Sequence, residues 1–380
     1  MPNSKVHIVA VVGTRPEVVK MAPVISALKS SDWARVSVLA TAQHREMLDQ
    51  SLAVFGIRAD MDLDLMLPNQ SLAKLTSRLV AGLDDAYEAL RPDAVLAQGD
   101  TTTVLASALC AFYRRIPFGH VEAGLRTHAI DNPFPEEMNR VMTARVAKWH
   151  FAPTERSAEN LLAEGVPAQR IHVTGNTVID ALLEVANRAA PSPFPRVASR
   201  RLILVTAHRR ENFGEPLRNV LLAIRTLVER RPDIEVLYPV HPNPNVRSAV
   251  AAVLSNHPRV SLIKPLDYTQ FIAAMKSASV ILSDSGGVQE EAPALGKPVL
   301  VLRNETERPE AVEAGVVKLV GSDRETIVLE TERLLDDPTY YRSMARGSSP
   351  YGDGRAAERI HRVLRENFVS ATKQELEELK

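Results

Sequence analysis

The sequence predicts an α/β protein built from two parallel β-sheets. Short apolar runs alternate with helical patterns along the chain, beginning with VHIVAVVG, EVVKMAPVISALKS, RVSVLATA and HREMLDQSLAVFG, and this alternation predicts parallel strands joined by crossover helices. Several strands are apolar without alternation, as in sheets that helices cover on both faces. The length of 380 residues favours two domains, at about 150 residues per domain.

The predicted elements fall into two halves of similar size. The first half continues with the strand DAVLAQGD, the helix TTTVLASALCAFYRR and the strands IPFGHVEAG, KWHFAP and RIHVTGN. After the helix TVIDALLEVANRAA comes PSPFPRVASR, the densest proline cluster of the chain and typical of a linker, which we place near residues 176–199.

The strand and helix pattern then restarts. The predicted strands are RLILVTAHRRE, EVLYPVHP, RVSLIKP, SVILSDSG, KPVLVLRN and VVKLVG, with helices such as PLRNVLLAIRTLVERR between them. A last helix near residues 355–367 could pack on either half by its pattern alone.

The composition gives no global attraction to nucleic acid or to a membrane. The 46 Lys and Arg residues balance the 46 Asp and Glu residues, so any anion site must be local. Cys110 is the only cysteine, which excludes an intrachain disulfide and fits a reducing cytoplasm. No apolar run approaches the ~20 residues of a membrane span, and the N-terminal segment lacks a signal-peptide pattern. We expect a cytoplasmic protein without membrane insertion.

Unusual polar residues follow one predicted strand after another. The segments at these positions are GTRPE, QGDTTT, HVEAGLRT, TAHRREN, PVHPNP and SDSGG. In open parallel sheets, ligands bind beyond the carboxyl ends of the strands. We therefore expect the functional site there, in a cleft that collects residues from both halves.

The SDSGG segment allows two interpretations. Gly286 and Gly287 can adopt positive φ, and with Ser285 they precede a helix whose first amides could hold a diphosphate. Alternatively the segment is a tight turn capped by Ser285 or Asp284. ALGKPVL is no Walker A loop, because Pro298 stands where Ser or Thr is needed, and GxGxxG is also missing.

Basic residues follow the first strand of each half. Arg15 and Lys20 lie near a helix start and suit a phosphate or carboxylate of a substrate. The alternative is a local ion pair between Arg15 and Glu17. His208 opens the run HRRE after the strand LILVTA and raises the same question in the second half.

Acidic residues cluster in the first half. Asp100 and Glu122 end strands, and Glu136 opens a helix, so two carboxylates could divide the roles of acid and base. The alternatives are that Asp100 caps the helix beginning TTTV and that Glu136 pairs with a helix dipole.

The histidines do not predict a metal site. None of the ten is in an HExxH motif or comparable spacing, although His120, His208 and His241 lie near strand ends. The absence of GxSxG also argues against an esterase. We expect a mechanism without metal or other cofactor.

Together these motifs resemble the non-hydrolysing bacterial UDP-N-acetylglucosamine 2-epimerase family. The resemblance extends from about residue 6 to 321 and rests on GTRPEVVKMAP, QGDTTT, HVEAGLRT, PFPEEMNR, VTGNTVIDAL, TAHRREN, PLDYTQF and SDSGGVQEEAPALGKPVLVLR followed by TERPEAV.

The resemblance implies two Rossmann-like domains of the GT-B type facing a central cleft. Residues 1–178 with the C-terminal helix in 355–380 would form the first, and residues 179–354 the second, UDP-binding domain. It also implies interconversion of UDP-N-acetylglucosamine and UDP-N-acetylmannosamine, through anti elimination of UDP to 2-acetamidoglucal and re-addition. The enzyme would need no metal or nicotinamide, and would act as a homodimer.

The resemblance also assigns site residues. Those on the nucleotide side would be Arg15, His208, Phe271, Ser285, Gly286, Gly287, Glu291 and Arg308. Those on the sugar and catalytic side would be Lys20, Asp100, Glu122, Glu136 and Arg140, with His208 also in the catalytic set and the three acids as the acid/base set. An allosteric UDP-N-acetylglucosamine site would use Gln43, Glu46, Arg210 and His241, although the family often has glutamine where this chain has Glu46.

Three alternatives share parts of this pattern. A glycosyltransferase of the same fold would share the UDP cradle but would not need three acids around the sugar. A hydrolysing epimerase would let water capture the glycal and release free N-acetylmannosamine. A catalytically silent nucleotide-sugar sensor would be expected to lack one of the acids Asp100, Glu122 and Glu136, and all three are present.

Overall fold

The chain divides into two compact units in the computed structural model. The structure describes residues 5–41, 45–65, 67, 70–188, 197–209, 212–306 and 308–378, with side chains left out for 45–47 and 370–378. Unit 1 comprises Met1–Ala181 and Gly352–Lys380, and unit 2 comprises Leu182–Tyr351. The division falls inside a helix, before the proline-rich segment, most of which lies outside the described residues.

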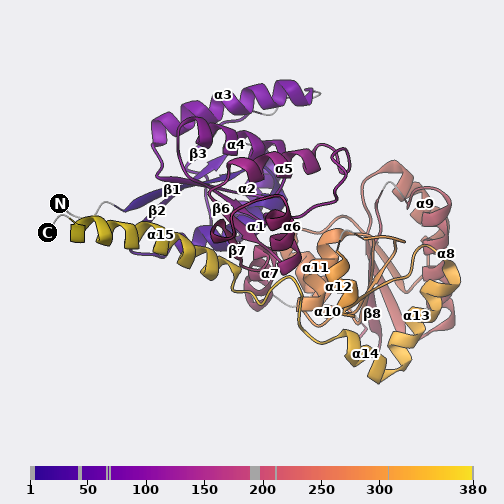
Figure 1. The fold of residues 1–380 in the computed structure, drawn as a ribbon. Coiled ribbons are helices and arrows are strands. Elements are labelled where there is room, and N and C mark those ends of the chain that lie inside the picture. Colours follow the sequence, from indigo (N-terminus) through magenta and orange to yellow (C-terminus); the bar gives the residue numbers. More distant parts are fainter. Residues whose placement is uncertain are drawn as a thin grey trace. The chain divides into compact units, whose positions relative to one another are not determined.

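Unit 1 is built on a seven-stranded parallel sheet (Figure 1). Its strand order is β3-β2-β1-β4-β5-β6-β7. The strands are β1 (Val6–Val12), β2 (Ala34–Ala40), β3 (Met61–Asp62), β4 (Ala94–Gln98), β5 (Phe118–Val121), β6 (Trp149–Ala152) and β7 (Ile171–Val173). The helices are α1 (Arg15–Lys29), α2 (Arg45–Val54), α3 (Leu72–Leu90), α4 (Thr102–Tyr113), α5 (Glu136–Val146), α6 (Glu155–Ala163), α7 (Thr177–Arg188), which ends in unit 2, and α15 (Ala356–Glu378).

Unit 2 repeats the plan with a six-stranded parallel sheet of order β10-β9-β8-β11-β12-β13. Its strands are β8 (Arg201–Thr206), β9 (Ile234–Pro239), β10 (Val260–Ile263), β11 (Val280–Ser283), β12 (Val299–Val301) and β13 (Val317–Leu319). Its helices are α8 (Glu215–Arg230), α9 (Pro244–Leu254), α10 (Tyr268–Ser277), α11 (Gly286–Ala294), α12 (Pro309–Glu313), α13 (Arg324–Asp336) and α14 (Pro338–Met344). The predicted α/β class with two parallel sheets is confirmed.

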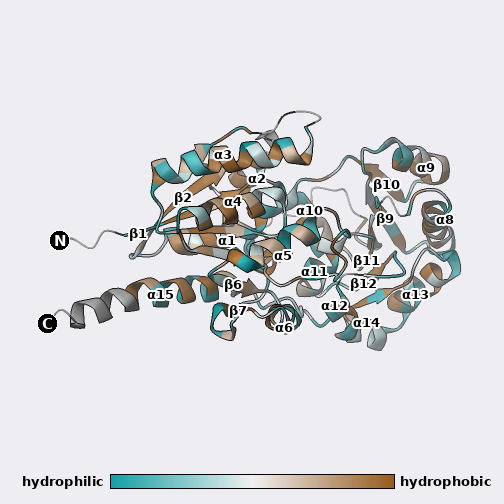
Figure 2. Ribbon diagram, turned by 45° about the horizontal axis from the view of Figure 1, so that its top comes forward, coloured by the Kyte–Doolittle hydropathy of each residue, from teal (hydrophilic) through white to brown (hydrophobic). Residues whose placement is uncertain are grey.

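Each sheet is buried between helices, which explains its unbroken apolar strands. The core of unit 1 joins Val9 and Val95 of the sheet to Leu83 of α3. In unit 2, Val205 of the sheet packs with Ile224 of α8 in the same core. Figure 2 shows the strands of both sheets as predominantly hydrophobic. Burial on both faces is the main stabilising contribution to such sheets.

The last helix belongs to unit 1 and is longer than the sequence pattern predicted. Trp33 stacks on Phe368 of α15 with ring centroids 6.4 Å apart, and its indole Nε1 donates to His361 at 3.0 Å. The carboxylate of Asp180 accepts hydrogen bonds from the first two amides of α15, at 3.2 and 2.8 Å. A carboxylate at that position caps the helix and complements its dipole.

The strand order of each sheet reverses at one point. In unit 1 the reversal lies between β1 and β4, and in unit 2 between β8 and β11. Chains leaving the two neighbouring strands go to opposite faces there, so a crevice is left at the carboxyl ends. Among the residues that the structure describes, no helix is long and apolar enough to cross a membrane.

Candidate functional site

In unit 1 the loop after β1 is fixed by a buried carboxylate. Glu17 is 2% exposed and accepts hydrogen bonds from the amides of Gly13 and Thr14, at 2.5 and 3.0 Å. It also accepts one from the Thr101 hydroxyl at 2.6 Å, which ties this loop to the loop after β4. Glu17 thus closes a capping box at the start of α1.

The environment of Glu17 contradicts the local ion pair with Arg15. Among the described residues Arg15 makes no ion pair, and both Glu17 oxygens are used by Gly13, Thr14 and Thr101. Burial raises the pKa of Glu17 to about 7, although these three hydrogen bonds lower it. The cationic head of Arg15 is therefore left at the carboxyl end of β1 without a carboxylate from this loop.

Asp100 follows β4, and it is not a helix cap. The N-cap of α4 is Thr101, whose side chain accepts from the Val104 amide. The carboxylate of Asp100 instead accepts from Nη2 of Arg140 at 2.6 Å. The capping interpretation of Asp100 was therefore wrong, because the next residue does that work.

Glu122 follows β5 in a strained backbone conformation. Its φ is +64°, and non-glycine residues held in this left-handed region cluster at functional sites. Lys20 donates from Nζ to Glu122 Oε2, and Gln98 donates to the same oxygen at 3.0 Å. The structure thereby joins the ends of β4 and β5 with the first turns of α1.

Glu136 and Glu137 open α5, which starts after Pro135 without a side-chain cap. Glu136 is half-buried. Glu137 is 2% exposed and accepts from Nη1 of Arg140 at 2.8 Å. The sequence assigned no role to Glu137. When two adjacent acids open a helix, the sequence does not show which of them is buried and which faces a site.

A buried histidine holds the loop after β4 from the side of β5. His120 Nε2 lies 2.7 Å from the carbonyl oxygen of Gly99. Burial lowers the pKa of His120 to about 4. The ring is therefore neutral at pH 7 and donates its Nε2 proton to Gly99, directly before Asp100.

In unit 2 the key group at the reversal point is Asp284, which is completely buried. Its Oδ2 accepts from the amides of His208 and Arg209, at 2.9 and 2.8 Å, and from Nδ2 of Asn212 at 3.1 Å. Asp284 thus joins the loops after β8 and β11. It does not cap α11, whose N-cap is Ser285 without a side-chain hydrogen bond, so the capped-turn interpretation was wrong.

The two glycines of α11 do not use positive φ, contrary to expectation. Both lie in the first turn of α11 and outside the left-handed region. A Cβ on Gly286 would lie 3.2 Å from Cζ of Arg308, whereas one on Gly287 would meet only ordinary contacts. Gly286 therefore allows close approach of Arg308, and Gly287 leaves the helix N-terminus open to an anion.

His208 stacks on His241, with ring centroids 5.3 Å apart and an interplanar angle of 11°. Its Nδ1 lies 3.5 Å from Oδ1 of Asp284. Burial lowers the pKa of His208, as do the charges of His241 and Arg209, whereas Asp284 raises it. The imidazole thus lies with Nδ1 on the side of Asp284 without a hydrogen bond to it.

The remaining nucleotide-side residues lie on α10, on α11 and at the start of α12. Glu291 is buried and accepts from the Tyr268 hydroxyl at 3.0 Å. Arg308 donates to Glu290 at 2.7 Å. Phe271, on α10, is half-buried. Tyr268 and Glu290 were given no site role although they lie in the motifs PLDYTQF and SDSGGVQEEA, because the sequence does not show that they contact Glu291 and Arg308.

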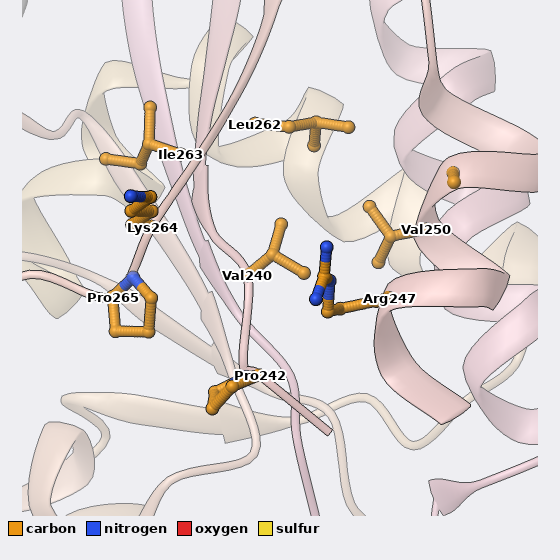
Figure 3. A pocket seen from close by; sticks show the side chains of 9 residues that line it. Val240, Pro242, Arg247, Val250, Leu262, Ile263, Lys264 and Pro265 are labelled. Carbon is orange, nitrogen blue, oxygen red and sulfur yellow. The ribbon is translucent and has the colours of Figure 1, made fainter. Parts of the chain in front are cut away.

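The four predicted allosteric residues are only partly described. Gln43 and Arg210 lie outside the described residues, and Glu46 is described without its side chain. His241 is exposed after β9. Its neighbours Val240 and Pro242 line a cavity of about 520 Å³ between α9 and β10, into which Arg247 extends from α9 toward Val240 (Figure 3). None of the predicted site residues lines this cavity.

No cluster that could hold a metal occurs in the described part of the chain, where no three His, Cys, Asp or Glu side chains are grouped for it.

Comparisons with known proteins agree with one another. The family model described as UDP-N-acetylglucosamine 2-epimerase matches residues 26–365. A protein of Ralstonia nicotianae named "Probable UDP-N-acetylglucosamine 2-epimerase" is 50% identical over 373 residues, which cover 95% of this chain and 99% of that protein. The UDP-N-acetylglucosamine 2-epimerase of Escherichia coli is 49% identical over 373 residues, covering 96% and 99%.

A solved structure shares the fold over nearly the whole chain. The crystal structure of UDP-GlcNAc 2-epimerase from Neisseria meningitidis, bound to UDP-GlcNAc, matches with a TM-score of 0.87 at 48% identity, covering 95% of this chain and 100% of that chain. The two Rossmann-like, GT-B-type sheets are therefore confirmed. With a family match over residues 26–365 and about half its residues shared with curated members, the chain belongs to the UDP-N-acetylglucosamine 2-epimerase family.

Proposed function

We propose that the protein is a non-hydrolysing UDP-N-acetylglucosamine 2-epimerase, which interconverts UDP-N-acetylglucosamine and UDP-N-acetylmannosamine. The observation that carries the proposal is the complete set of three acids at the carboxyl end of the unit 1 sheet, in a chain about half identical to curated epimerases. Two of these acids, Asp100 and Glu122, are each held by a cation from another element.

The reaction begins with loss of the C2 proton to a carboxylate. The C2–H electron pair forms a C1=C2 double bond while the C1–O bond breaks anti to it and its electrons leave with UDP. UDP then adds back to C1 of the bound 2-acetamidoglucal, and C2 takes a proton on its other face. Departure of a diphosphate, a good leaving group, makes it possible to ionise a C–H bond that no neighbouring ketone activates.

The unit 1 residues supply the proton transfers. We assign Asp100, Glu122 and Glu136 as the acid/base set, with Lys20 and Arg140 orienting carboxylates and binding the sugar. Ionised carboxylates accept protons when they are held within hydrogen-bond reach of the substrate. The paired cations Lys20 and Arg140 support this role because each holds one oxygen of its carboxylate, Glu122 Oε2 and Asp100 Oδ2 respectively.

The unit 2 residues bind the nucleotide of the same substrate. The amides of Gly286 and Gly287 beside Ser285, and the dipole of α11, suit the diphosphate, with Arg15 as its cationic partner and the His208 imidazole as a further contact. Glu291 accepts hydrogen bonds from the ribose, Phe271 lies by the uracil, and Arg308 completes the pocket.

The same proposal extends to regulation and assembly. We assign a second UDP-N-acetylglucosamine, bound by Gln43, Glu46, Arg210 and His241, as an activator. We further propose that the enzyme is a cytoplasmic homodimer that supplies N-acetylmannosamine for cell-surface polysaccharides. Light scattering and the dependence of the reverse reaction on added UDP-N-acetylglucosamine test the assembly and the activation.

One experiment separates this function from its rivals. The pure protein is incubated with UDP-N-acetylglucosamine in D2O and followed by proton NMR. Epimerisation gives deuterium at C2 and two UDP-sugars with little free UDP. Stoichiometric free N-acetylmannosamine would instead show a hydrolysing epimerase, and an unchanged sugar would favour the glycosyltransferase or the sensor.

A further inference from the structure

Helix α5 holds Asp100 through two different groups. Asn139, which is 1% exposed, donates from Nδ2 to the backbone oxygen of Asp100 at 2.8 Å. Arg140 donates from Nη2 to the Asp100 carboxylate at 2.6 Å. One turn of α5 therefore fixes both the backbone and the side chain of an acid in the loop after β4.

The position of Arg140 depends in turn on Glu137. Nη1 of Arg140 donates to Glu137 Oε2 at 2.8 Å, while Nη2 donates to Asp100. The guanidinium, with a side chain 12% exposed, is thus shared by two carboxylates. A planar guanidinium that makes both bonds has little freedom to rotate.

Glu137 also holds the loop that separates two of the proposed acids. Its Oε1 accepts from the amides of Thr127 and His128, at 3.0 and 3.1 Å. These amides lie in the segment between Glu122 and Glu136. A buried carboxylate is tolerated only where such donors compensate its lost hydration.

A first-turn acid that served only the helix dipole would need none of these partners. Glu137 instead directs one oxygen to the loop and the other to the cation on Asp100. Resting on the function proposed above, we infer that Glu137 is a positioning residue: it holds Arg140 against Asp100 and fixes the loop between Glu122 and Glu136, so that the three acids keep one arrangement.

The test compares Glu137→Gln with the wild type in the C2 epimerisation assay. Glutamine keeps an oxygen acceptor for the Thr127 and His128 amides but loses the charge that holds Arg140. We expect kcat to fall about 10- to 100-fold, because small displacements of reacting groups have effects of this size. The affinity for UDP should stay within about 2-fold, since UDP lacks the sugar to which Asp100 and Arg140 are assigned.

Two further variants separate positioning from structural support. In the Arg140→Gln background, Glu137→Gln should add no further loss if it acts through Arg140. Glu88→Gln is the matched control, because Arg114 is likewise shared by Asp84 and Glu88 in the same unit. This control should leave kcat unchanged.

The outcomes distinguish the inference from the proposed function. No epimerisation by the wild type would reject the function itself. An active wild type with an equally active Glu137→Gln variant, or with additive losses in the double variant, would overturn the positioning role. If Glu137→Gln does not fold, Glu137→Asp tests the same link, because it keeps the charge and shortens the reach, and an unchanged kcat would again overturn it.

Discussion

The carboxyl ends of the two sheets use their charges differently. In unit 1, carboxylates pair with side-chain cations from other elements, as Glu122 does with Lys20 and Asp100 with Arg140. In unit 2, the central carboxylate of Asp284 is fully buried and bonds mainly to backbone amides. The helix that follows it starts with two glycines and keeps its N-terminus uncapped by side chains.

Under the proposed function, this difference would divide two tasks that one substrate requires between the two units. Carboxylates held by cations can present oxygens in fixed positions for proton transfer. A loop folded around a buried carboxylate keeps its shape while helix amides remain available to a diphosphate. The expected division is chemistry in unit 1 and nucleotide binding in unit 2, and the following predictions test it in order of decreasing effect.

The acids of unit 1 should control turnover without controlling nucleotide binding. We expect Asp100→Asn or Glu122→Gln to lower kcat about 10²- to 10⁴-fold, the usual contribution of a general acid or base. The affinity for UDP should change little in calorimetry. Retained turnover in both variants would reject the catalytic assignment.

The buried Glu17 should make the stability of unit 1 depend on pH. Burial raises its pKa to about 7, above the value of 4.5 that it has in water. The folded state therefore holds the proton more tightly, and this contribution to stability is present below about pH 4.5 and is lost as the pH rises through about 7.

Glu17→Gln imitates the protonated form. Its free energy of unfolding relative to that of the wild type should therefore rise by up to about 3 kcal/mol between pH 4.5 and 8. Urea unfolding at several pH values measures the difference. Glu88→Gln, an exposed control, should show no such trend. If the difference in unfolding free energy between Glu17→Gln and the wild type did not change with pH, the prediction would be contradicted.

Arg15 is an exception to the division between catalysis in unit 1 and nucleotide binding in unit 2, because it lies in unit 1 but is assigned to the diphosphate. Arg15→Ala should weaken UDP binding about 10- to 100-fold, the typical loss for a charged hydrogen bond. Arg35→Ala, an exposed arginine on β2, serves as the control in the same calorimetric titration. Unchanged affinity for UDP would remove Arg15 from the site.

A substitution at Gly287 tests whether the start of α11 in unit 2 binds the diphosphate. An added Cβ would lie 3.9 Å from Glu291 Oε2 and 4.0 Å from Ser285 Oγ, so the folded state has room for it. Gly287→Ala should leave the melting temperature unchanged or slightly raised and weaken UDP binding about 10-fold by crowding the phosphate. Gly286→Ala should in addition displace Arg308. If both variants bound UDP as tightly as the wild type, the assignment of the diphosphate to the start of α11 would be contradicted.

Local sequence patterns predicted the parallel sheets and most of the strand ends that carry the candidate site residues. Apolar runs and helical periods are properties of neighbouring residues, so they could be interpreted without a structure. Asp100, Glu122 and Glu136 were selected in this way, because each follows a strand or opens a helix. The same patterns left open a capping role for Asp100 and allowed positive φ at Gly286 and Gly287, and the structure shows neither.

The sequence by itself determined the alternation of strands and helices, the two α/β halves and the polar segments at the strand ends, because these follow from short-range periodicity. Only the tertiary structure decided which of these segments meet. Glu17 reaches Thr101 across 84 residues, and His208 reaches Asp284 across 76. Contacts of this kind are set by the order of strands in a sheet, which brings β1 beside β4 and β8 beside β11, and no local pattern encodes that order.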